Sequence, residues 1–357
     1  MYTLNMKTTT ILTVNSIEPE QEIINQAASL IQAGQVVAFP TETVYGLGAN
    51  AMDANAVEKI FIAKGRPSND PLIVHLADAR DLKKVAIEIP EMVVKLGEKF
   101  WPGPLTLVVP KAQCIPPNVT AGLDTVAVRV PNHPVALALI RASHTPIAAP
   151  SANKFSGVSP TSAQHVYQDL KNRISLILDG GSTSIGVEST VLDCTCWPPQ
   201  VLRPGGISLE ELRAFLGDVG IYENSDNKNK VVQSPGMLDK HYSPKAKLYY
   251  FLSADPHNYQ TFFLNSIEKE LKACQKIGVL VIQEDKDWFD QNYPDIEIII
   301  LGERDNLNQI ASNLYAGLRT LDEKNVDCIF IHDFGTQGVG LAIRDRLIRA
   351  SSQVIEN

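Results

Sequence analysis

The stretch VVAFPTETVYGLG, residues 36–48, joins a short apolar run to a set of polar and small residues. The run Val36–Phe39 predicts a buried strand, and Pro40, which lacks a backbone N–H group, ends it. Hydroxyl groups, a carboxylate and two glycines follow at once, so a loop at the strand end would present polar side chains and exposed backbone N–H groups. The stretch therefore predicts an α/β protein whose chemistry lies on loops at the ends of strands.

Outward from this stretch, helical periodicity predicts a helix over 21–33, and Asp53 can cap a second helix that ends at Gly65. Together with the elements that follow, they predict a mixed α/β first domain. Further strands are expected over 72–76, 105–109, 125–130, 147–149, 176–179 and 189–193. Further helices are expected over 81–100 in two pieces broken at Pro90, over 135–142, over 161–170 with Thr161 as the N-cap candidate, and over 209–215.

Residues 217–246 differ in character from the segments on either side. They include an Asn-rich polar run at 223–229 and the breaker Ser-Pro-Gly at 234–236, which together are typical of a linker. Beyond it, strands expected over 247–252, 277–282, 296–301 and 326–332 alternate with helices expected over 259–275, 307–323 and 339–351. This alternation predicts a second domain with a parallel-rich, Rossmann-like sheet.

The composition of the 357 residues is that of an ordinary globular protein, with 44% hydrophobic and 20% charged residues. The formal net charge of −8 disfavours a non-specific nucleic-acid coat protein, which would normally be basic. Residues 1–14 have no long apolar core, and the longest apolar runs are of strand length. We therefore expect a cytoplasmic protein with no membrane anchor.

The five cysteines form no C-x-x-C pair, which argues against a disulfide framework and against a structural zinc site. Cys194 and Cys196 are the one close pair. Alternate residues of a strand face the same way, so the two thiols could share a metal ion. Two thiols in a reducing compartment are the preferred interpretation.

Several standard signatures are missing: the P-loop, a G-x-G-x-x-G after the first strand, H-E-x-x-H and G-x-S-x-G. Gly335-x-x-Gly338-x-Gly340 follows a predicted strand and opens a predicted helix, so it could hold a phosphate. Its spacing differs from that of a dinucleotide fingerprint, which favours a plain turn between strand and helix.

Four further polar segments follow predicted elements: KGRP at 64–67, APSAN at 149–153, GVEST at 186–190 and LRPG at 202–205. Lys64 and Arg66 lie two residues apart around a glycine, so both can reach one polyanion, and arginine can fork onto phosphate oxygens. Each segment alone is typical of a solvated turn. Together they predict a polar cleft for a phosphorylated ligand.

These segments resemble the L-threonylcarbamoyladenylate synthases of the YrdC family, in the longer two-domain form. The shared motifs, in chain order, are PTETVYGLG at 40–48, KGR at 64–66, WPGPLT at 101–106, APSAN at 149–153, GVESTV at 186–191 and the linker PGM…HYSP at 235–244. The match is specific over residues 15–245 and looser beyond. The resemblance implies a YrdC-like twisted mixed sheet with a concave ligand cleft over residues 15–216. It further implies a linker at 217–246 that folds over the site and a Rossmann-like C-terminal domain at 247–357.

The resemblance also implies the activity, that of a nucleotidyltransferase. L-threonine, bicarbonate and ATP would give threonylcarbamoyl-AMP and pyrophosphate, with Mg²⁺ accompanying ATP. A tRNA threonylcarbamoyl transferase complex would then take the product for the tRNA adenosine next to the anticodon. Neither a membrane nor strong direct binding of nucleic acid is expected.

Residue by residue, the resemblance makes Lys64 and Arg66 catalytic and assigns no protein ligand to a metal. The residues expected to bind ATP are Lys64, Arg66, Asp70, Thr125, Ser151, Asn153, Ser159, Arg203 and Tyr242. The residues expected to bind threonine are Thr43, His75, Arg129, the Ala149 backbone and Ser189. There are two departures from the family: Asp70 stands where relatives usually have asparagine, and Leu238-Asp239 replaces more basic linker residues.

The implied chemistry suits these residue types. The carbamate of threonine is already an anionic nucleophile, so the enzyme needs positioning and charge neutralisation and no Ser–His–Asp machinery. Lys64, Arg66 and Arg203 are the natural phosphate clamps, and Arg129 is the natural partner of the threonine carboxylate.

The linker carries a hypothesis of its own. Its aromatic ring and imidazole would be wasted in a plain spacer, and its prolines lower the entropy cost of docking. We expect residues 234–245 to lie across the mouth of the site and exclude water, with Tyr242 near the nucleotide.

Two other functions stay open. One is an RNA-binding module without ATP turnover. The other is carbamoyl transfer in hydrogenase maturation, whose larger proteins carry C-x-x-C pairs that this chain lacks.

Overall fold

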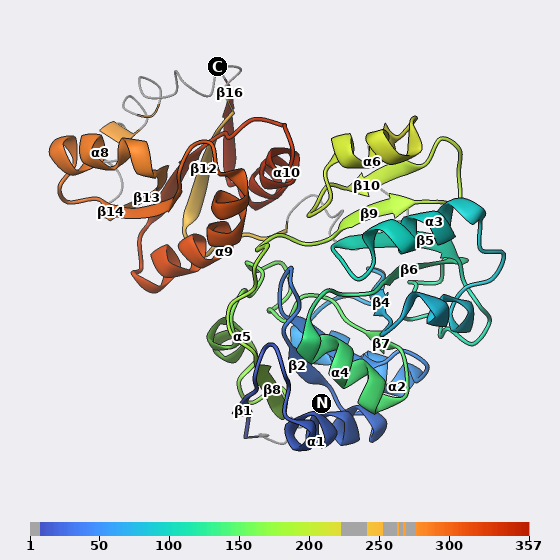
Figure 1. Cartoon of the computed structure of the whole chain (residues 1–357). Helices are drawn as coiled ribbons and strands as arrows, with labels where there is room; N and C mark the ends of the chain where they lie inside the picture. The colour runs from blue at the N-terminus through green and yellow to red at the C-terminus, as the bar shows by residue number, and fades with distance from the viewer. Residues whose placement is uncertain (1–7, 223–240, 253–262, 264–266, 269–275, 357) are drawn as a thin grey trace. The chain divides into compact units, whose positions relative to one another are not determined.

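The computed structural model describes residues 8–222, 241–252, 263, 267–268 and 276–356 (Figure 1). Their contacts divide the chain into two compact units. The first unit holds residues 1–155, 159–184 and 188–238, and the second holds 156–158, 185–187 and 239–357. The predicted linker role of 217–246 stays a prediction, because residues 223–240 lie outside the described part of the chain.

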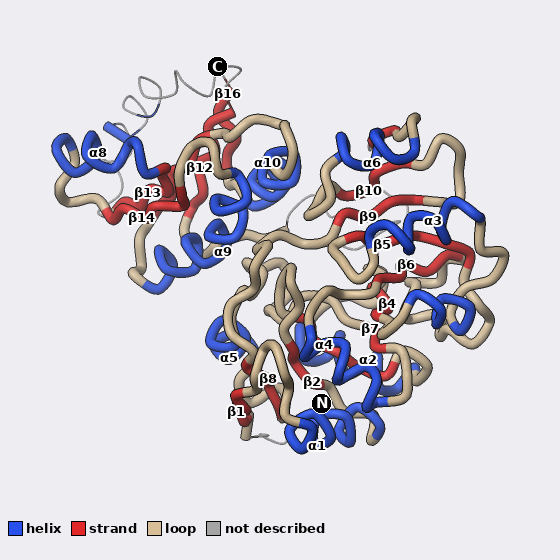
Figure 2. The backbone as a smooth tube through the Cα atoms, in the orientation of Figure 1, coloured by secondary structure: helices blue, strands red, loops and turns tan. Residues whose placement is uncertain are grey.

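The described residues of the first unit form an eleven-stranded mixed sheet in the order β1-β8-β2-β3-β7-β4-β6-β5-β9-β10-β11, which Figure 2 shows in red. The sheet contains parallel pairs such as β4 with β6 and antiparallel pairs such as β4 with β7. The strands are β1 Thr10–Thr13, β2 Val37–Phe39, β3 Gly46–Asn50, β4 Ile73–His75, β5 Leu105–Pro110, β6 Thr125–Arg129, β7 Ile147–Ala148, β8 Leu176–Asp179, β9 Thr190–Asp193, β10 Gln200–Arg203 and β11 Gly220–Ile221.

Helices cover both faces of this sheet because strand residues alternate between the faces. Val37 and Phe39 of β2 pack in one apolar cluster with α1 and α4, while Ala38 between them packs in another with α2, α3 and α5. The helices are α1 Gln21–Gln32, α2 Ala54–Lys64, α3 Glu91–Phe100, α4 Pro134–Ser143, α5 Ala163–Leu170 and α6 Leu209–Leu216, with a 3₁₀ helix η1 at Ala79–Lys84. The predicted mixed α/β first domain is confirmed.

Helix α2 ends where the sequence predicts. The Asp53 side chain accepts a hydrogen bond from the Asn55 backbone N–H, and Gly65 adopts a left-handed φ of 67°. A left-handed residue is the usual end of a helix, and glycine has no Cβ to oppose it. These two residues therefore place Lys64 as the last residue of the helix.

Three local predictions were wrong. Residues 46–48 do not remain in the loop after Pro40 but begin strand β3, which pairs antiparallel with β2. Ser162, not Thr161, caps α5, because its hydroxyl accepts from the His165 backbone N–H. The first part of the helix predicted over 81–100 is the short η1, and the short strands β1, β10 and β11 had not been predicted.

The described residues of the second unit form a sheet of five parallel strands in the order β14-β13-β15-β12-β16. The strands are β12 Lys247–Leu252, β13 Ile277–Ile282, β14 Glu297–Gly302, β15 Cys328–His332 and β16 Gln353–Glu356, and the helices are α8 Lys286–Asn292, α9 Leu307–Glu323 and α10 Gly340–Ala350, with a 3₁₀ helix η2 at Gln283–Asp285. The predicted parallel, Rossmann-like sheet is confirmed, whereas most of the helix predicted over 259–275 lies outside the described residues.

Candidate functional site

Predicted site residues lie at both ends of strand β4. His75, at its C-terminal end, lies in register with Arg129 on the neighbouring β6. At the other end, the carbonyl oxygen of Ile73 accepts a hydrogen bond from the Ala149 backbone N–H, which anchors the APSAN loop. Two groups of predicted residues thus lie a few residues apart along one buried strand.

Arg129 is the centre of the threonine group. Its guanidinium lies 2.6 Å from Glu42 Oε2 and donates hydrogen bonds to Thr43 Oγ1 at 2.9 Å and to the Gly103 carbonyl at 3.2 Å. All these contacts are buried, and a buried guanidinium needs such partners to offset the loss of water. The structure therefore brings Arg129 and Thr43 together, and it shows that the Arg129 fork already holds a carboxylate.

His75 is buried beside this group. Burial and the nearby Arg129 charge lower its pKa to about 3, so the imidazole is neutral at ordinary pH. Its ring meets Phe39 edge to face, with 6.3 Å between ring centroids. His75 can therefore offer a neutral polar edge to a ligand, and it adds no charge.

Ser189 belongs to a buried hydrogen-bond network that also contains Arg203. The Ser189 and Thr106 hydroxyls lie 2.8 Å apart, and the Arg203 guanidinium donates to the Ser189 carbonyl at 2.9 Å and to its hydroxyl at 3.2 Å. A residue expected for threonine and a cation expected for ATP are therefore in direct contact.

Lys64 is held by the APSAN loop. Its ammonium donates to the carbonyl oxygens of Ser151 and Asn153, each at 2.6 Å. Within the loop, the Ser151 hydroxyl donates to Asn153 Oδ1 at 2.5 Å. Carbonyl oxygens orient the ammonium without cancelling its charge, so this part of the site stays cationic.

Asp70 lies among the three predicted phosphate clamps. Arg66 forms an ion pair with it at 2.9 Å and donates to the Pro71 carbonyl at 2.8 Å. Complete burial raises the pKa of Asp70, and the charges of Arg66, Lys64 and Arg203 oppose that rise. These three cations are therefore close enough to act on one carboxylate, and so on one polyanion.

The other predicted residues have different surroundings. Thr125 begins β6, at the end of the strand opposite Arg129. Ser159 is fully buried, and its hydroxyl donates to Glu188 Oε1 at 2.6 Å. Tyr242 belongs to the second unit, where its ring stacks on Tyr315 at 5.8 Å. A contact between Tyr242 and the nucleotide stays a prediction.

Sequence reasoning did not assign Glu42, Thr106 and Glu188, although each contacts a predicted site residue. All three belong to motifs already quoted for the resemblance, namely PTETVYGLG, WPGPLT and GVESTV. The shared motifs themselves could therefore have pointed to these three residues. The motif residues do not show which side chain a buried arginine or serine contacts.

Other candidate features lie apart from these residues. The described residues hold no group of three or more His, Cys, Asp or Glu side chains that could bind a metal. Cys194 is buried, and burial raises its pKa, which suits a structural thiol. Gly335 and Gly338 adopt left-handed φ values of 83° and 55° in the turn before α10.

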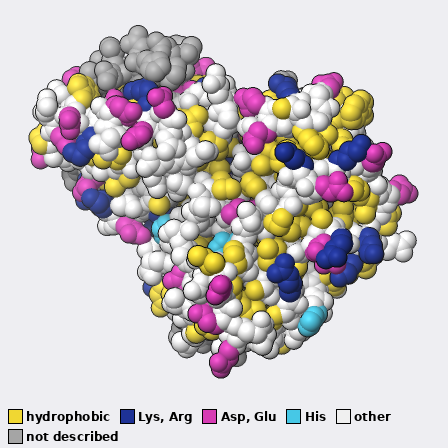
Figure 3. Space-filling model, viewed as in Figure 1, with side chains coloured by type: hydrophobic (Ala, Val, Ile, Leu, Met, Phe, Trp, Pro, Cys, Tyr) yellow, Lys and Arg dark blue, Asp and Glu magenta, His cyan; other side chains and the backbone are white. Residues whose placement is uncertain are grey.

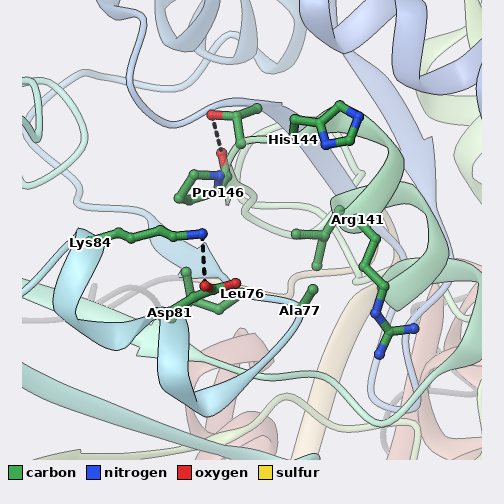
Figure 4. Close-up of a pocket in the computed structure, with 9 residues that line it drawn as sticks. Leu76, Ala77, Asp81, Lys84, Arg141, His144 and Pro146 are labelled. Carbon is green, nitrogen blue, oxygen red and sulfur yellow. Dashed lines mark hydrogen bonds and ion pairs between the residues drawn. The ribbon is translucent and has the colours of Figure 1, made fainter.

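A cavity of about 290 Å³ lies beyond the C-terminal end of β4 and contains none of the predicted residues (Figure 4). Its charged lining includes Asp81 and Lys84, which pair with one another at 2.7 Å, and Arg141, which points away from that pair. No helix in the described part of the chain has the length and hydrophobicity needed to span a bilayer.

Known proteins resemble this chain over nearly its whole length. Residues 29–205 match the Sua5/YciO/YrdC family, described as "Telomere recombination", and residues 207–352 match the family described as "Threonylcarbamoyl-AMP synthase, C-terminal domain". The threonylcarbamoyl-AMP synthase of Bacillus subtilis is 47% identical over 92% of both chains. That of Pyrococcus abyssi is 46% identical over 93% of this chain and 95% of its own.

The fold matches as well as the sequence. The crystal structure of P. abyssi Sua5 complexed with L-threonine superposes with a TM-score of 0.90 and 43% identity, covering 98% of this chain and 100% of that one. Both parts of the chain therefore have counterparts in one solved protein. The chain belongs to the Sua5/YrdC family, in its two-domain form.

Proposed function

We propose that this chain is a threonylcarbamoyl-AMP synthase, which converts L-threonine, bicarbonate and ATP into threonylcarbamoyl-AMP and pyrophosphate. The observation that carries the proposal is the position of Arg203. It donates to Ser189 in the threonine group, and its charge acts on Asp70 among the phosphate clamps. A reaction that joins an amino acid to a nucleotide requires adjacent sites for the two substrates.

Arg129 holds the carboxylate of threonine in this proposal. One nitrogen of its guanidinium already pairs with the Glu42 carboxylate at 2.6 Å, so the position suits a carboxylate partner. The Thr43 and Ser189 hydroxyls and the neutral His75 ring surround the amine and hydroxyl of the substrate. The relative solved with L-threonine supports this assignment.

The chemical step needs no protein nucleophile. The threonine amine and bicarbonate combine to a carbamate with loss of water, and a carbamate oxygen then attacks the α-phosphorus of ATP. The P–O bond to the β-phosphate breaks, and pyrophosphate leaves with that electron pair. Lys64, Arg66 and Arg203 neutralise the charge that develops on the phosphate oxygens.

Asp70 suits a role beside a metal that enters with ATP. A Mg²⁺ ion that accompanies ATP takes most of its ligands from phosphates and water, and a single carboxylate completes such a site. Asp70 is a buried carboxylate on which the charges of all three cations act, and burial raises its pKa. A bound divalent ion would compensate the charge of this carboxylate and neutralise the phosphates.

Downstream, the product is an acyl adenylate, which hydrolyses easily and must reach its acceptor quickly. We assign that acceptor as tRNA, through a tRNA threonylcarbamoyl transferase complex, and we place the chain in the cytoplasm. The threonylcarbamoyl-AMP synthases among the relatives support this assignment.

The alternative of an RNA-binding module predicts a continuous basic surface. On the face in Figure 3, Lys and Arg side chains are instead mixed with Asp and Glu. The net charge of −8 is also unfavourable for a polyanionic partner. No observation therefore favours this alternative over the synthase.

The deciding experiment incubates the full chain with L-threonine, bicarbonate, Mg²⁺ and ATP. We expect pyrophosphate release that requires threonine, together with a product of the mass of threonylcarbamoyl-AMP. Omission of each substrate in turn is the control. Tight, salt-sensitive binding of RNA with no pyrophosphate release would instead support the RNA-binding module.

The linker hypothesis stays part of this proposal. Residues 234–240 lie outside the described part of the chain, and Tyr242 packs within the second unit. The test compares Tyr242→Ala in the full chain with a chain cut after about residue 216. Full synthesis by both, without extra free intermediate or hydrolysed product, would make the linker a simple tether.

A further inference from the structure

The second compact unit includes two short segments whose sequence lies inside the predicted catalytic domain. These are residues 156–158 and residues 185–187, and they join the C-terminal residues 239–357 in one set of contacts. Only Gly186 and Val187 among these residues belong to a segment that the sequence singled out, the polar GVEST at 186–190. The contacts that each segment makes therefore show what the second unit contributes.

The first segment is held by its backbone. The guanidinium of Arg319, on α9, donates to the carbonyl oxygen of Val158. The Ser243 backbone N–H donates to the Ser156 carbonyl at 2.9 Å, and Gly157 forms a parallel bridge with Ser243. Arg319 is only 8% exposed, so its hydrogen bond is shielded from water and strengthened by its charge.

The second segment is held by close approach. A Cβ added to Gly186 would lie 2.4 Å from the Cα of Ser312 and 2.5 Å from the carbonyl oxygen of Ala311, both on α9. These are backbone atoms of a helix, which cannot yield as a flexible side chain would. Gly186 is therefore the residue that lets this segment lie directly against α9.

Both segments end one residue before a residue of the candidate site. Ser159 follows the first segment and belongs to the predicted nucleotide group, and Glu188 follows the second and precedes Ser189 of the threonine group. The Ser159 hydroxyl donates to Glu188 Oε1 at 2.6 Å, and both residues are buried. The two segments thus lead directly into Ser159 and Glu188, the two residues of one hydrogen bond. That bond links the nucleotide group to the residue that precedes Ser189 of the threonine group.

We propose that α9 is a positioning element for the synthase reaction. Arg319 and the close packing at Gly186 fix the two segments, and the segments fix the Ser159–Glu188 hydrogen bond and with it the spacing of the nucleotide and threonine groups. The inference rests on the proposed function, since it names what sets the geometry of that site. Arg319 acts through the segment at 156–158 and touches no substrate itself.

Positioning matters here because the reaction has little covalent chemistry for the protein to perform. Catalysis by orientation is steep in distance, and a displacement of about 1 Å can cost roughly a hundredfold in rate. Loops reach such precision only when other elements hold them. Helix α9, which contacts both segments within the second unit, supplies that support.

The first test compares two glycines of one loop. Gly186→Ala places a methyl group against the α9 backbone, while Gly181→Ala places one in open space, and the two residues have similar φ values of 78° and 86°. Both variants therefore place alanine at a left-handed φ, and only Gly186→Ala displaces the segment from α9. Pyrophosphate release gives kcat and the KM values for ATP and threonine.

We expect Gly186→Ala to lower kcat/KM for ATP by about 10- to 100-fold, and Gly181→Ala to stay within a few-fold of the wild type. Partial unfolding would lower the amount of active enzyme and leave the KM for ATP unchanged, whereas displacement of Ser159 raises that KM. Equal losses in the two variants, or none in either, would overturn the proposal.

The second test removes the other contact, in case Gly186→Ala does not fold. Arg319→Met keeps the length of the side chain and loses the donor, and Arg319→Lys keeps a charged donor. Lys324→Ala is the control, because Lys324 directly follows α9 and its exposed ammonium pairs with Glu297 on β14. We expect a raised KM for ATP in Arg319→Met, partial rescue in Arg319→Lys and wild-type kinetics in Lys324→Ala.

Wild-type kinetics in Arg319→Met would overturn the role of Arg319. If the wild-type chain itself releases no threonine-dependent pyrophosphate, the proposed function fails. Calorimetric binding of a non-hydrolysable ATP analogue then tests positioning alone, and equal affinities for the wild type, Gly186→Ala and Arg319→Met would overturn it.

Discussion

Two carbonyl-held cations of the first compact unit can be compared with one carboxylate-held cation of the second. In the first, Lys64 and Arg203 donate to main-chain carbonyl oxygens of Asn153 and Ser189. In the second, Arg344 donates to the buried carboxylate of Asp333, which also accepts from the Tyr250 hydroxyl. A carbonyl orients a cation and leaves its charge available, whereas a carboxylate cancels it. Lys64 and Arg203 therefore suit anionic substrates, whereas Arg344 helps to hold the fold of its unit. Each unit also contains the other kind of contact, as the Arg66–Asp70 pair and the Arg319 hydrogen bond to the Val158 carbonyl show.

Like Arg66, Arg129 combines the two kinds of contact. It donates to the Gly103 carbonyl, as Arg203 does to Ser189, and it also pairs with the Glu42 carboxylate, as Arg344 does with Asp333. Its removal should therefore damage both folding and substrate binding. This makes it the strongest test of the difference between the units.

The largest expected effect is that of Arg129→Ala. Loss of one partner leaves Glu42 buried without compensation, so the free energy of unfolding should fall by about 3–5 kcal/mol. Arg344→Ala, which exposes Asp333 to the same loss, is the matched variant in the second unit. Denaturant unfolding and steady-state kinetics of both variants provide the measurement.

We expect a comparable loss of stability in Arg129→Ala and Arg344→Ala, and a raised KM for threonine in Arg129→Ala alone. The double variant Arg129→Met/Glu42→Gln should recover part of the stability and none of the threonine binding. An unchanged KM for threonine in Arg129→Ala would remove Arg129 from the substrate site and erase the difference between the units.

The extent to which the sequence predicts this site differs between residue types. Lys64 and Arg66 could be placed from the sequence, because the Asp53 cap and the left-handed Gly65 are local signals that fix the end of α2. Strands β1, β3, β10, β11 and β16 had not been predicted, whereas the other strands of both units followed equally well from apolar runs bounded by prolines and glycines. Local physics alone determines these features.

Partner choice could not be predicted in the same way. Whether Arg129 would contact Thr43, or Ser159 contact Glu188, depends on contacts across 86 and 29 positions of the chain that no local pattern encodes. The inclusion of 156–158 and 185–187 in the second unit is likewise a tertiary property. Strand β3 was missed because glycines at residues 46 and 48 resemble a loop, although Gly48 is required by the Phe39 ring, 2.7 Å from where its Cβ would lie.

The next largest effect concerns a carbonyl-held cation. Lys64→Ala should cost on the order of 1.5–3 kcal/mol of transition-state stabilisation, the value of a hydrogen bond to a charged group, measured as kcat/KM for ATP. Lys59→Ala is the matched control, because Lys59 lies on the same helix and also donates to a carbonyl, that of Gly34, at 2.6 Å. Equal kinetic losses in both variants would mean that α2, and not the charge of Lys64, matters.

Two buried histidines allow the two units to be compared by the pH dependence of their stability. Burial lowers the pKa of His75 to about 3 and that of His332, in the second unit, to about 4. A depressed histidine pKa means that the unfolded chain binds the proton first. The stability contributed by the neutral ring is therefore complete above about pH 6.5 and is lost as the pH falls toward the folded pKa.

At about pH 5, protonation of each histidine in the unfolded chain should lower the free energy of unfolding by roughly 2 kcal/mol relative to about pH 7.5. His75→Gln and His332→Gln should each reduce that dependence in urea unfolding followed for its own unit. The KM for threonine should rise in His75→Gln and stay unchanged in His332→Gln. A threonine KM that responds equally to both variants would contradict a substrate contact at His75.

The smallest effect is the discrimination between threonine and serine, which tests the threonine group without disturbing the fold. Serine keeps the carboxylate for Arg129 and a hydroxyl for the Thr43 and Ser189 region, and it lacks only one methyl group. A methyl group in a fitted pocket is worth about 1–3 kcal/mol, so kcat/KM for serine should be about 10- to 200-fold lower.

Arg129→Lys should weaken both substrates alike and preserve their ratio, because the carboxylate is common to both. Gly186→Ala should also preserve the ratio, since it disturbs the spacing of the two groups and leaves the methyl contact in place. Equal turnover of serine and threonine by the wild type would show that no pocket encloses the methyl group, and the polar contacts around Arg129 would then be the whole of the recognition.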